Sequence, residues 1–353
     1  MAATRRMKSS IVIIAAAIAI ALVLGYMQRD LILLRLFDRA LAQAMADRPF
    51  ADDGMHILFC GTGSPLPSRD RAEACTAVIA GGQLFIFDAG EGAARNLMAM
   101  GAPMGRARGV FLTHLHSDHI NGLGNVALQH WVGSTARAPL PLLGPAGTAQ
   151  VGAAFNAAYT LDAGYRTAHH GPAVAPPAGT GLAPRDIAPG VVHDAGGVRI
   201  TAFAVNHAPV APAFGYRIDW AGRSVTISGD TAPTPALIAA ARGSDVLIAE
   251  MLNPQLVGRM EAAARAAGNA ERAQIFADIP GYHLTPKQAG EAAAAAKVKQ
   301  LTFTHIVPAV PPFMEGLLTR GAGDAFSGPI HIAADGDVIT IGADKTIERT
   351  SRF

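Results

Sequence analysis

The chain has 353 residues, half of them hydrophobic, and a formal net charge of +2. It is long enough for one large domain or two ordinary ones with a substantial core. The charge is uneven, because residues 1–50 hold seven basic and three acidic residues, whereas residues 51–353 hold 22 basic and 24 acidic ones. The body therefore lacks the basic surplus of proteins that bind long polyanions, which argues against a long nucleic-acid substrate but leaves a local basic patch open.

Near the N-terminus, three basic residues precede an uncharged run of 17 residues, 11–27. This length lies between a signal-peptide core and the roughly 20 residues of a full span. No small-residue cleavage site follows, so we expect an uncleaved signal anchor over 1–29, a single-pass helix in the inner membrane. The positive flank predicts a cytoplasmic N-terminus and a catalytic domain on the periplasmic side. The alternative is a buried helix of a soluble protein.

An amphipathic stretch follows this run, and we expect a helical linker over 30–54. Apolar side chains recur along one face of it, at Leu31, Leu34, Phe37, Leu41 and Met45. The remaining residues, 55–353, are predicted to form the main domain.

The main domain begins with three predicted strands, at 56–60, 76–80 and 83–87, the last two joined by a glycine turn. Cys60 and Cys75 lie beside these strands. They form no C-x-x-C pair, so we expect buried free thiols, with a disulfide between them as the less favoured alternative.

Helices become frequent further along the chain. They are predicted near 147–159, at 235–241 and 261–278, and after Thr285, a helix cap followed by proline. The stretch 163–190 is predicted to be irregular. Strands first and helices interleaved later indicate an α/β fold with two sheets covered by helices.

The most informative stretch follows a short predicted strand at 109–112. It reads H-x-H-x-D-H and consists of His114, His116, Asp118 and His119. Imidazole and carboxylate are ligands that zinc accepts, and two adjacent metal ions activate water for hydrolysis. The alternative is a polar loop with surface histidines. It is disfavoured because His207, Asp230, Glu250 and His305 also end predicted strands, where sites of layered α/β folds gather.

These segments resemble the metallo-β-lactamase fold, in its ribonuclease Z-like and arylsulfatase-like branch. The residues that carry the resemblance are Gly61-Thr-Gly63-Ser-Pro65, Asp88-Ala-Gly90-Glu91-Gly92, the 113–119 run, His207, Gly215-Tyr-Arg217, Ser228-Gly229-Asp230-Thr231, His283-Leu-Thr285 and Thr304-His305. The resemblance covers about 56–340 and implies a four-layer αβ/βα sandwich.

The resemblance also implies two divalent metal ions, with zinc as the first expectation and manganese or iron as alternatives. The implied ligands are His114, His116 and His207 for one ion, Asp118, His119 and His305 for the other, and Asp230 as the bridge. Asp88 would orient a ligand histidine. A hydroxide between the ions would be the nucleophile.

Three residues are implied to be catalytic. His283 would act as general acid or oxyanion donor, Glu250 would orient its imidazole, and Asp118 would serve the chemistry as well as the metal. The family's tRNA-processing members carry a long arm after the Gly-Tyr-Arg strand, yet only 22 residues separate His207 from Asp230. No such arm fits there.

We therefore predict a hydrolase of a small anionic substrate, either a phosphodiester or a sulfate ester. The first alternative is a ribonuclease Z-type tRNA 3′-endonuclease. A lactonase or β-lactamase, and a scaffold without turnover, are further alternatives. The resemblance also leaves a homodimer open.

Overall fold

The computed structural model describes residues 2–46 and 49–353. The chain divides into two compact units, Met1–Pro49 and Phe50–Phe353. The first unit contains one helix, α1 (Ala2–Ala46). Residues 47–48, inside the stretch expected to be a linker, lie outside the described residues. The second unit contains all the predicted site residues.

The expected membrane anchor is wrong. In the described part of the chain, no helix is both long enough and apolar enough to cross a membrane. The expected inner-membrane topology with a periplasmic catalytic domain, which depended on that anchor, is withdrawn.

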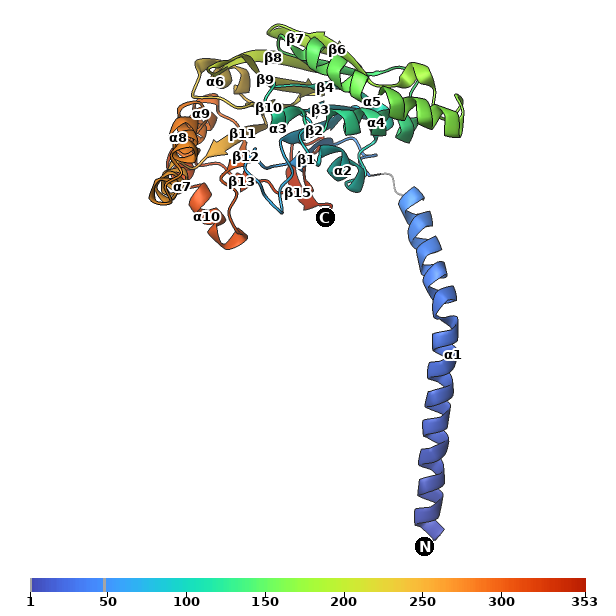
Figure 1. Ribbon diagram of the computed structural model, residues 1–353. Coiled ribbons are helices and arrows are strands. Elements are labelled where there is room, and N and C mark those ends of the chain that lie inside the picture. The colour runs from blue at the N-terminus through green and yellow to red at the C-terminus, as the bar shows by residue number, and fades with distance from the viewer. Residues whose placement is uncertain (1, 47–48) are drawn as a thin grey trace. The chain divides into compact units, whose positions relative to one another are not determined.

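The second unit is built on two sheets (Figure 1). The first sheet has the strand order β15 (Ile347–Ser351), β14 (Asp337–Ile341), β1 (Met55–Gly61), β2 (Cys75–Ala80), β3 (Gln83–Phe87), β4 (Ala107–Phe111), β5 (Leu140–Gly144) and β6 (Leu182–Asp186). The second has the order β13 (Ile330–Ile332), β12 (Gln300–Val307), β11 (Val246–Leu252), β10 (Arg223–Ile227), β9 (Val210–Trp220), β8 (Val198–His207) and β7 (Gly190–Ala195).

The central strands are buried along their whole length because they are covered on both faces. All seven residues of β1 are buried, and so are all seven of β11. Between the sheets, the rings of Phe87, Phe111 and Tyr216 lie 5.3–5.9 Å apart. Burial of such rings is the main favourable term that holds two sheets together.

Helices cover the outer face of each sheet (Figure 1). Over the first sheet lie α2 (Ala93–Ala99), α4 (Leu123–Ser134) and α5 (Thr148–His170). Over the second lie α6 (Pro235–Ala241), α9 (Pro286–Ala296) and α11 (Ala322–Ala325). This helix–sheet–sheet–helix order confirms the predicted two-sheet α/β fold. Thr285 forms the predicted cap of α9, accepting a hydrogen bond from the Gln288 backbone.

Two helix predictions need correction. Helix α5 continues to His170, through residues that we expected to be irregular. The helix expected at 261–278 is a hairpin of α7 (Pro254–Ala266) and α8 (Ala270–Asp278). The chain turns at Gly268, whose φ of +72° suits glycine, and Asn269 then caps α8.

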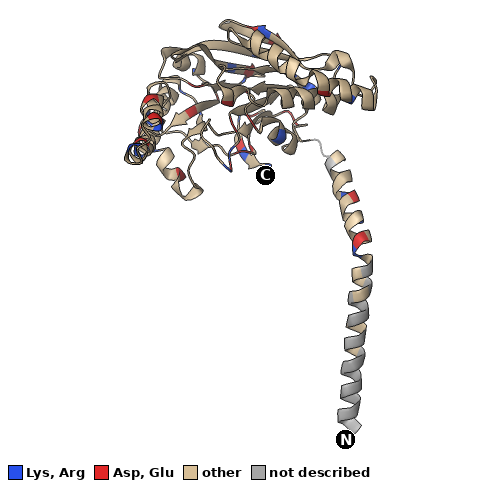
Figure 2. Ribbon diagram, in the orientation of Figure 1, with Lys and Arg blue, Asp and Glu red and all other residues tan. Residues whose placement is uncertain are grey.

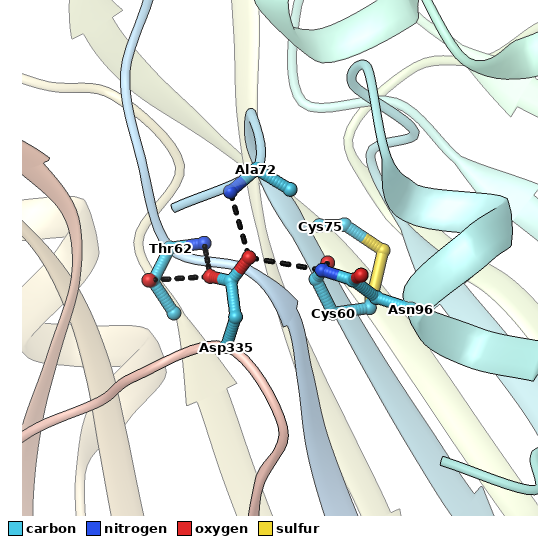
Figure 3. Close-up of a disulfide and its surroundings, with 6 residues drawn as sticks. All are labelled: Cys60, Thr62, Ala72, Cys75, Asn96 and Asp335. Carbon is cyan, nitrogen blue, oxygen red and sulfur yellow. Dashed lines mark hydrogen bonds between the residues drawn. A yellow bond between two sulfur atoms is a disulfide. The ribbon is translucent and has the colours of Figure 1, made fainter. Parts of the chain in front are cut away.

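The expectation of free thiols is also wrong, because Cys60 and Cys75 form a disulfide (Figure 3). Strands β1 and β2 pair antiparallel with Gly61 opposite Cys75, which brings the two cysteine Cα atoms to 5.0 Å. That separation falls within the range a disulfide spans. Strand pairing, which spacing alone does not reveal, therefore decides the state of the cysteines.

Candidate metal centre

The predicted site residues meet at one edge of the two sheets. His114 follows β4, and the short helix α3 (Ser117–Ile120) carries Asp118 and His119. His207 ends β8, and Asp230 follows β10.

His305 reaches the same edge through an irregularity in β12. The register between β11 and β12 pairs Glu250 with Thr304 and Met251 with Ile306, so His305 is an extra residue. Its φ of +47° is unusual for a residue with a side chain. Such a bulge re-aims one side chain without ending the strand.

Three imidazoles form the first cluster that could hold a metal ion. They belong to His114, His116 and His207. Nε2 of His114 lies 2.9 Å from Nδ1 of His116, and Nε2 of His207 lies 3.4 Å from that same atom. Two nitrogens bound tetrahedrally to one zinc ion are separated by about 3.3 Å. The spacing therefore fits one ion, and the exposed His116 opens this cluster to solvent.

The second cluster mixes imidazole and carboxylate, with Asp118, His119 and His305 as its members. Oδ2 of Asp118 lies 3.2 Å from Nε2 of His305 and 3.5 Å from Nε2 of His119. All three residues are buried. Nε2 of His119 has no hydrogen-bond partner although it is buried, and such a donor set with an orphaned nitrogen suits a divalent cation.

Asp230 is shared between the two clusters. Its Oδ2 lies 3.3 Å from Nε2 of His305 and 3.5 Å from Nε2 of His119. It also groups with His114 and with His207 within 4.8 Å. A carboxylate with two oxygens can serve two neighbouring ions, so the residues present fit a binuclear centre.

The electrostatics favour the protonation states that metal binding requires at three of the ligand residues, His114, His207 and Asp230. At His119 and His305, burial lowers the pKa but the neighbouring carboxylates outweigh it and raise the pKa, so these two imidazoles would have to release a proton when a metal ion binds. Burial lowers the pKa of His114 well below its ordinary value and that of His207 to about 4, so both imidazoles have free lone pairs at neutral pH. Burial works against ionisation of Asp230, but the charges of His305 and His119 outweigh it and hold the pKa of this carboxyl well below its usual range. Metal ligands must be deprotonated in this way.

Two hydrogen bonds fix the orientation of ligand rings. Asp88 accepts a hydrogen bond from Nδ1 of His119 at 2.8 Å, and it is itself held by the backbone and hydroxyl of Thr113, each at 2.8 Å. The carbonyl oxygen of Tyr282 lies 3.0 Å from Nδ1 of His207. Occupying one ring nitrogen leaves the other to face the centre. Sequence reasoning missed the Tyr282 carbonyl, because a main-chain acceptor leaves no residue-type signal.

The predicted pair of His283 and Glu250 lies beside Asp230. Nδ1 of His283 is 3.1 Å from Oε2 of Glu250 and 3.9 Å from Oδ2 of Asp230. Burial lowers the pKa of His283, but the charge and hydrogen bond of Glu250 outweigh it and raise this pKa to about 9. A group of this kind is a cation at neutral pH and can donate a proton.

Glu250 is also a fixed anchor. Its Oε1 accepts hydrogen bonds from the backbone of Leu284 at 2.7 Å and of Thr231 at 3.2 Å. It thereby ties the segment with His283 to the segment with Asp230.

A half-buried carboxylate, Asp335, supports the segment next to the site. Asp335 accepts four hydrogen bonds, from the backbone and hydroxyl of Thr62, the backbone of Ala72 and the side chain of Asn96 (Figure 3). The Thr62 carbonyl in turn accepts from Ile306, next to His305. Sequence reasoning did not select Asp335, although an Asp-Gly pair before a strand was the available signal.

The comparisons with known proteins agree with this geometry. The sequence profile described as Beta-lactamase superfamily domain matches residues 84–306. Ribonuclease Z from Mycobacterium bovis is 38% identical over 283 residues, which covers 80% of this chain and 96% of the relative. The chain belongs to the ribonuclease Z family. The resemblance drawn from the motifs is thereby confirmed.

Solved structures show the same fold. The metallo-beta-lactamase fold protein YhfI from Bacillus subtilis has a TM-score of 0.60 at 20% identity, covering 82% of this chain and 100% of that one. The short form of human tRNase Z has a TM-score of 0.58 at 21% identity, with coverage of 82% and 100%. At these identities the similarity concerns the fold alone.

Membership of the ribonuclease Z family counters one expectation. The lack of a basic surplus in the body of the chain predicts that nucleic acid is an unlikely partner. The relatives are named as ribonucleases, so that expectation is not supported. The reason is physical: net charge averaged over a whole domain does not describe a local surface.

Proposed function

We propose that the protein is a binuclear metal-dependent phosphodiesterase that hydrolyses a phosphodiester bond of RNA, as the name of its relatives implies for them. The observation that carries the proposal is the His283–Glu250 ion pair of 3.1 Å beside the shared carboxylate of Asp230. A phosphodiester develops extra negative charge in its transition state, and a buried cation at that point stabilises it. We assign this activity to residues 55–353.

The metal ligands are proposed on the basis of the two clusters. His114, His116 and His207 would hold one divalent ion, Asp118, His119 and His305 the other, and Asp230 both. Zinc is proposed because the donors are nitrogen and oxygen. When bound, two such ions would lower the pKa of a water molecule and neutralise charge on the phosphoryl group.

The chain's own residues would then perform three tasks. Asp88 and the Tyr282 carbonyl hold the Nδ1 protons of His119 and His207, which keeps their Nε2 atoms directed at the centre. Glu250 keeps His283 protonated. Since Nδ1 of His283 faces Glu250, Nε2 is the nitrogen left to donate a proton to the leaving oxygen.

A small phosphodiester is the second candidate substrate, and the β9–β10 hairpin favours it. Trp220 pairs with Arg223, so only Ala221 and Gly222 form the turn, and no arm extends from this described hairpin. An RNA would have to be held by other surfaces. A sulfate ester is the third candidate substrate, and the experiment below includes one.

The test uses the full chain loaded with zinc and three substrates in parallel. These are an RNA hairpin with a single-stranded 3′ extension, the nitrophenyl ester of thymidine 5′-monophosphate, and nitrophenyl sulfate. We expect site-specific cleavage of the RNA, lost in His283→Ala and retained in Asp324→Asn, an exposed control. Hydrolysis of the nitrophenyl phosphodiester alone would favour the second candidate. Hydrolysis of the sulfate alone would overturn both.

A further inference from the structure

Tyr282 lies between the candidate acid His283 and the first metal cluster, and its side chain is neither a candidate metal ligand nor a proton donor to either. Its ring centroid is 4.9 Å from the ring of His283 and 5.1 Å from the ring of His207, edge-on to the latter at 87°. The side chain is partly exposed. Its hydroxyl makes no hydrogen bond to any described residue. The ring therefore lies beside the candidate acid and one ligand of the first cluster, and it is partly open to solvent.

We propose that Tyr282 is a specificity-determining residue whose ring stacks on a planar group of the leaving alcohol, such as a nucleobase. The inference rests on the proposed function, in which His283 protonates the leaving oxygen. A group attached to that oxygen has to lie next to His283. The ring of Tyr282 neighbours His283, so it would lie within stacking distance of that group. Aromatic rings accept any base in this way, because every base has a π-face.

The element that carries Tyr282 supports this assignment. Helices α7 and α8 and the 3₁₀ turn Ile279–Gly281 fill the chain between Glu250 and His283. The α7–α8 hairpin shares a small core with Leu252 and Val307 of the neighbouring strands, and Leu66 packs against it. The hairpin is therefore a fixed structure next to the site. An element of this kind can hold an aromatic side chain in one position.

The charges of the α7–α8 hairpin favour stacking over electrostatic attraction as the way in which this part of the protein contacts the substrate. Both signs occur along α7 and α8 (Figure 2). The basic residues are Arg259, Arg265 and Arg272, and the acidic ones are Glu261, Glu271 and Asp278. With three charges of each sign, the hairpin offers no net attraction for phosphates. Contact with the substrate here would therefore depend on shape and on the aromatic ring.

The main chain and the side chain of Tyr282 have separable tasks. The carbonyl oxygen orients His207, whereas the partly exposed ring lies beside the rings of His207 and His283. Removing the ring leaves the carbonyl in place, so Tyr282→Ala is expected to keep the metal content of the wild type. This separation allows a sharp test.

The test compares two phosphodiesters that share a thymidine 5′-phosphoryl part. In one the leaving alcohol is a second nucleoside, and in the other it is propanol. For Tyr282→Ala we expect kcat/KM on the first to fall between about fivefold and 150-fold, the range of one base–aromatic stack, with the propyl ester unchanged. Tyr282→Phe should behave as wild type on both, and so should Tyr165→Ala, a control on the exposed face of α5.

An equal loss on both esters would overturn the proposal, because it would mean that the ring only positions the histidines. No loss on either would overturn it too. If the wild type hydrolyses neither ester, the proposed function fails, and binding decides the role of Tyr282. The zinc-loaded protein should then bind thymidine 3′-monophosphate more weakly in Tyr282→Ala, with binding of inorganic phosphate unchanged; equal binding by both proteins refutes stacking.

Discussion

Replacing Glu250 with Gln isolates the charge that keeps His283 protonated. Gln retains the oxygen that accepts from Leu284, so the fold should be preserved. Without the carboxylate charge, the pKa of His283 should fall from about 9 towards its ordinary value of 6.5, because burial is then opposed only by the charge of Asp230. If it reaches that value, the protonated fraction at pH 8 drops from about 90% to about 3%, roughly thirtyfold, whereas at pH 6 the loss is less than about twofold.

The assay is kcat/KM between pH 5.5 and 9.5 on a phosphodiester with an alkyl leaving group, which requires protonation. Two bound cations would lower the pKa of His283 in both proteins alike, so the separation of the two basic limbs is the quantity to compare. The Glu250→Gln limb should lie below that of the wild type, by up to about 2.5 pH units. Glu271→Gln on exposed α8 serves as the control. Parallel profiles with a common basic limb would refute the role of Glu250.

Three further predictions concern support of the site and of the fold. Asp88→Asn should weaken zinc affinity by about 10- to 100-fold in a chelator competition, because the orienting hydrogen bond to its imidazole partner is lost. Tyr216→Phe removes the buried 2.6 Å hydrogen bond to the Leu112 carbonyl and should cost about 1–3 kcal/mol of unfolding free energy in urea. The double change Cys60→Ser and Cys75→Ser opens a loop with a sequence separation of 15 and should cost about 3 kcal/mol.

Each of these has a contrary outcome. Unchanged zinc affinity in Asp88→Asn would mean that the ring of His119 is oriented by packing alone. Equal urea midpoints for Tyr216→Phe and wild type would show that the freed carbonyl is satisfied by water. If the double serine variant unfolds at the wild-type midpoint, the disulfide is not formed in solution.

Two kinds of site residue were predictable from the sequence. Some lie together in one short motif, and the others occupy positions that the family resemblance assigns. The H-x-H-x-D-H run places four ligand-type side chains after one strand, and such a pattern needs no tertiary information. His207, Asp230 and His305 come from distant strands, and the family resemblance assigned them. The structure brings all of them to one edge.

What the sequence could not predict depends on backbone geometry. The bulge that turns His305 into the centre and the carbonyl of Tyr282 that orients His207 are features of register, not of residue type. The disulfide was not predicted for the same reason, because it follows from the pairing of β1 with β2. The membrane anchor was predicted from an apolar run of 17 residues, which is shorter than the roughly 20 that a span requires.

The central claim is that this ribonuclease Z family member hydrolyses phosphodiesters with two metal ions held by one shared carboxylate. A titration of the metal-free full chain with zinc, followed by hydrolysis of the nitrophenyl ester of thymidine 5′-monophosphate, tests it most directly. We expect activity to rise until two equivalents are bound, and Asp230→Asn to abolish it. Full activity at one equivalent, or an active Asp230→Asn protein, would contradict the binuclear account.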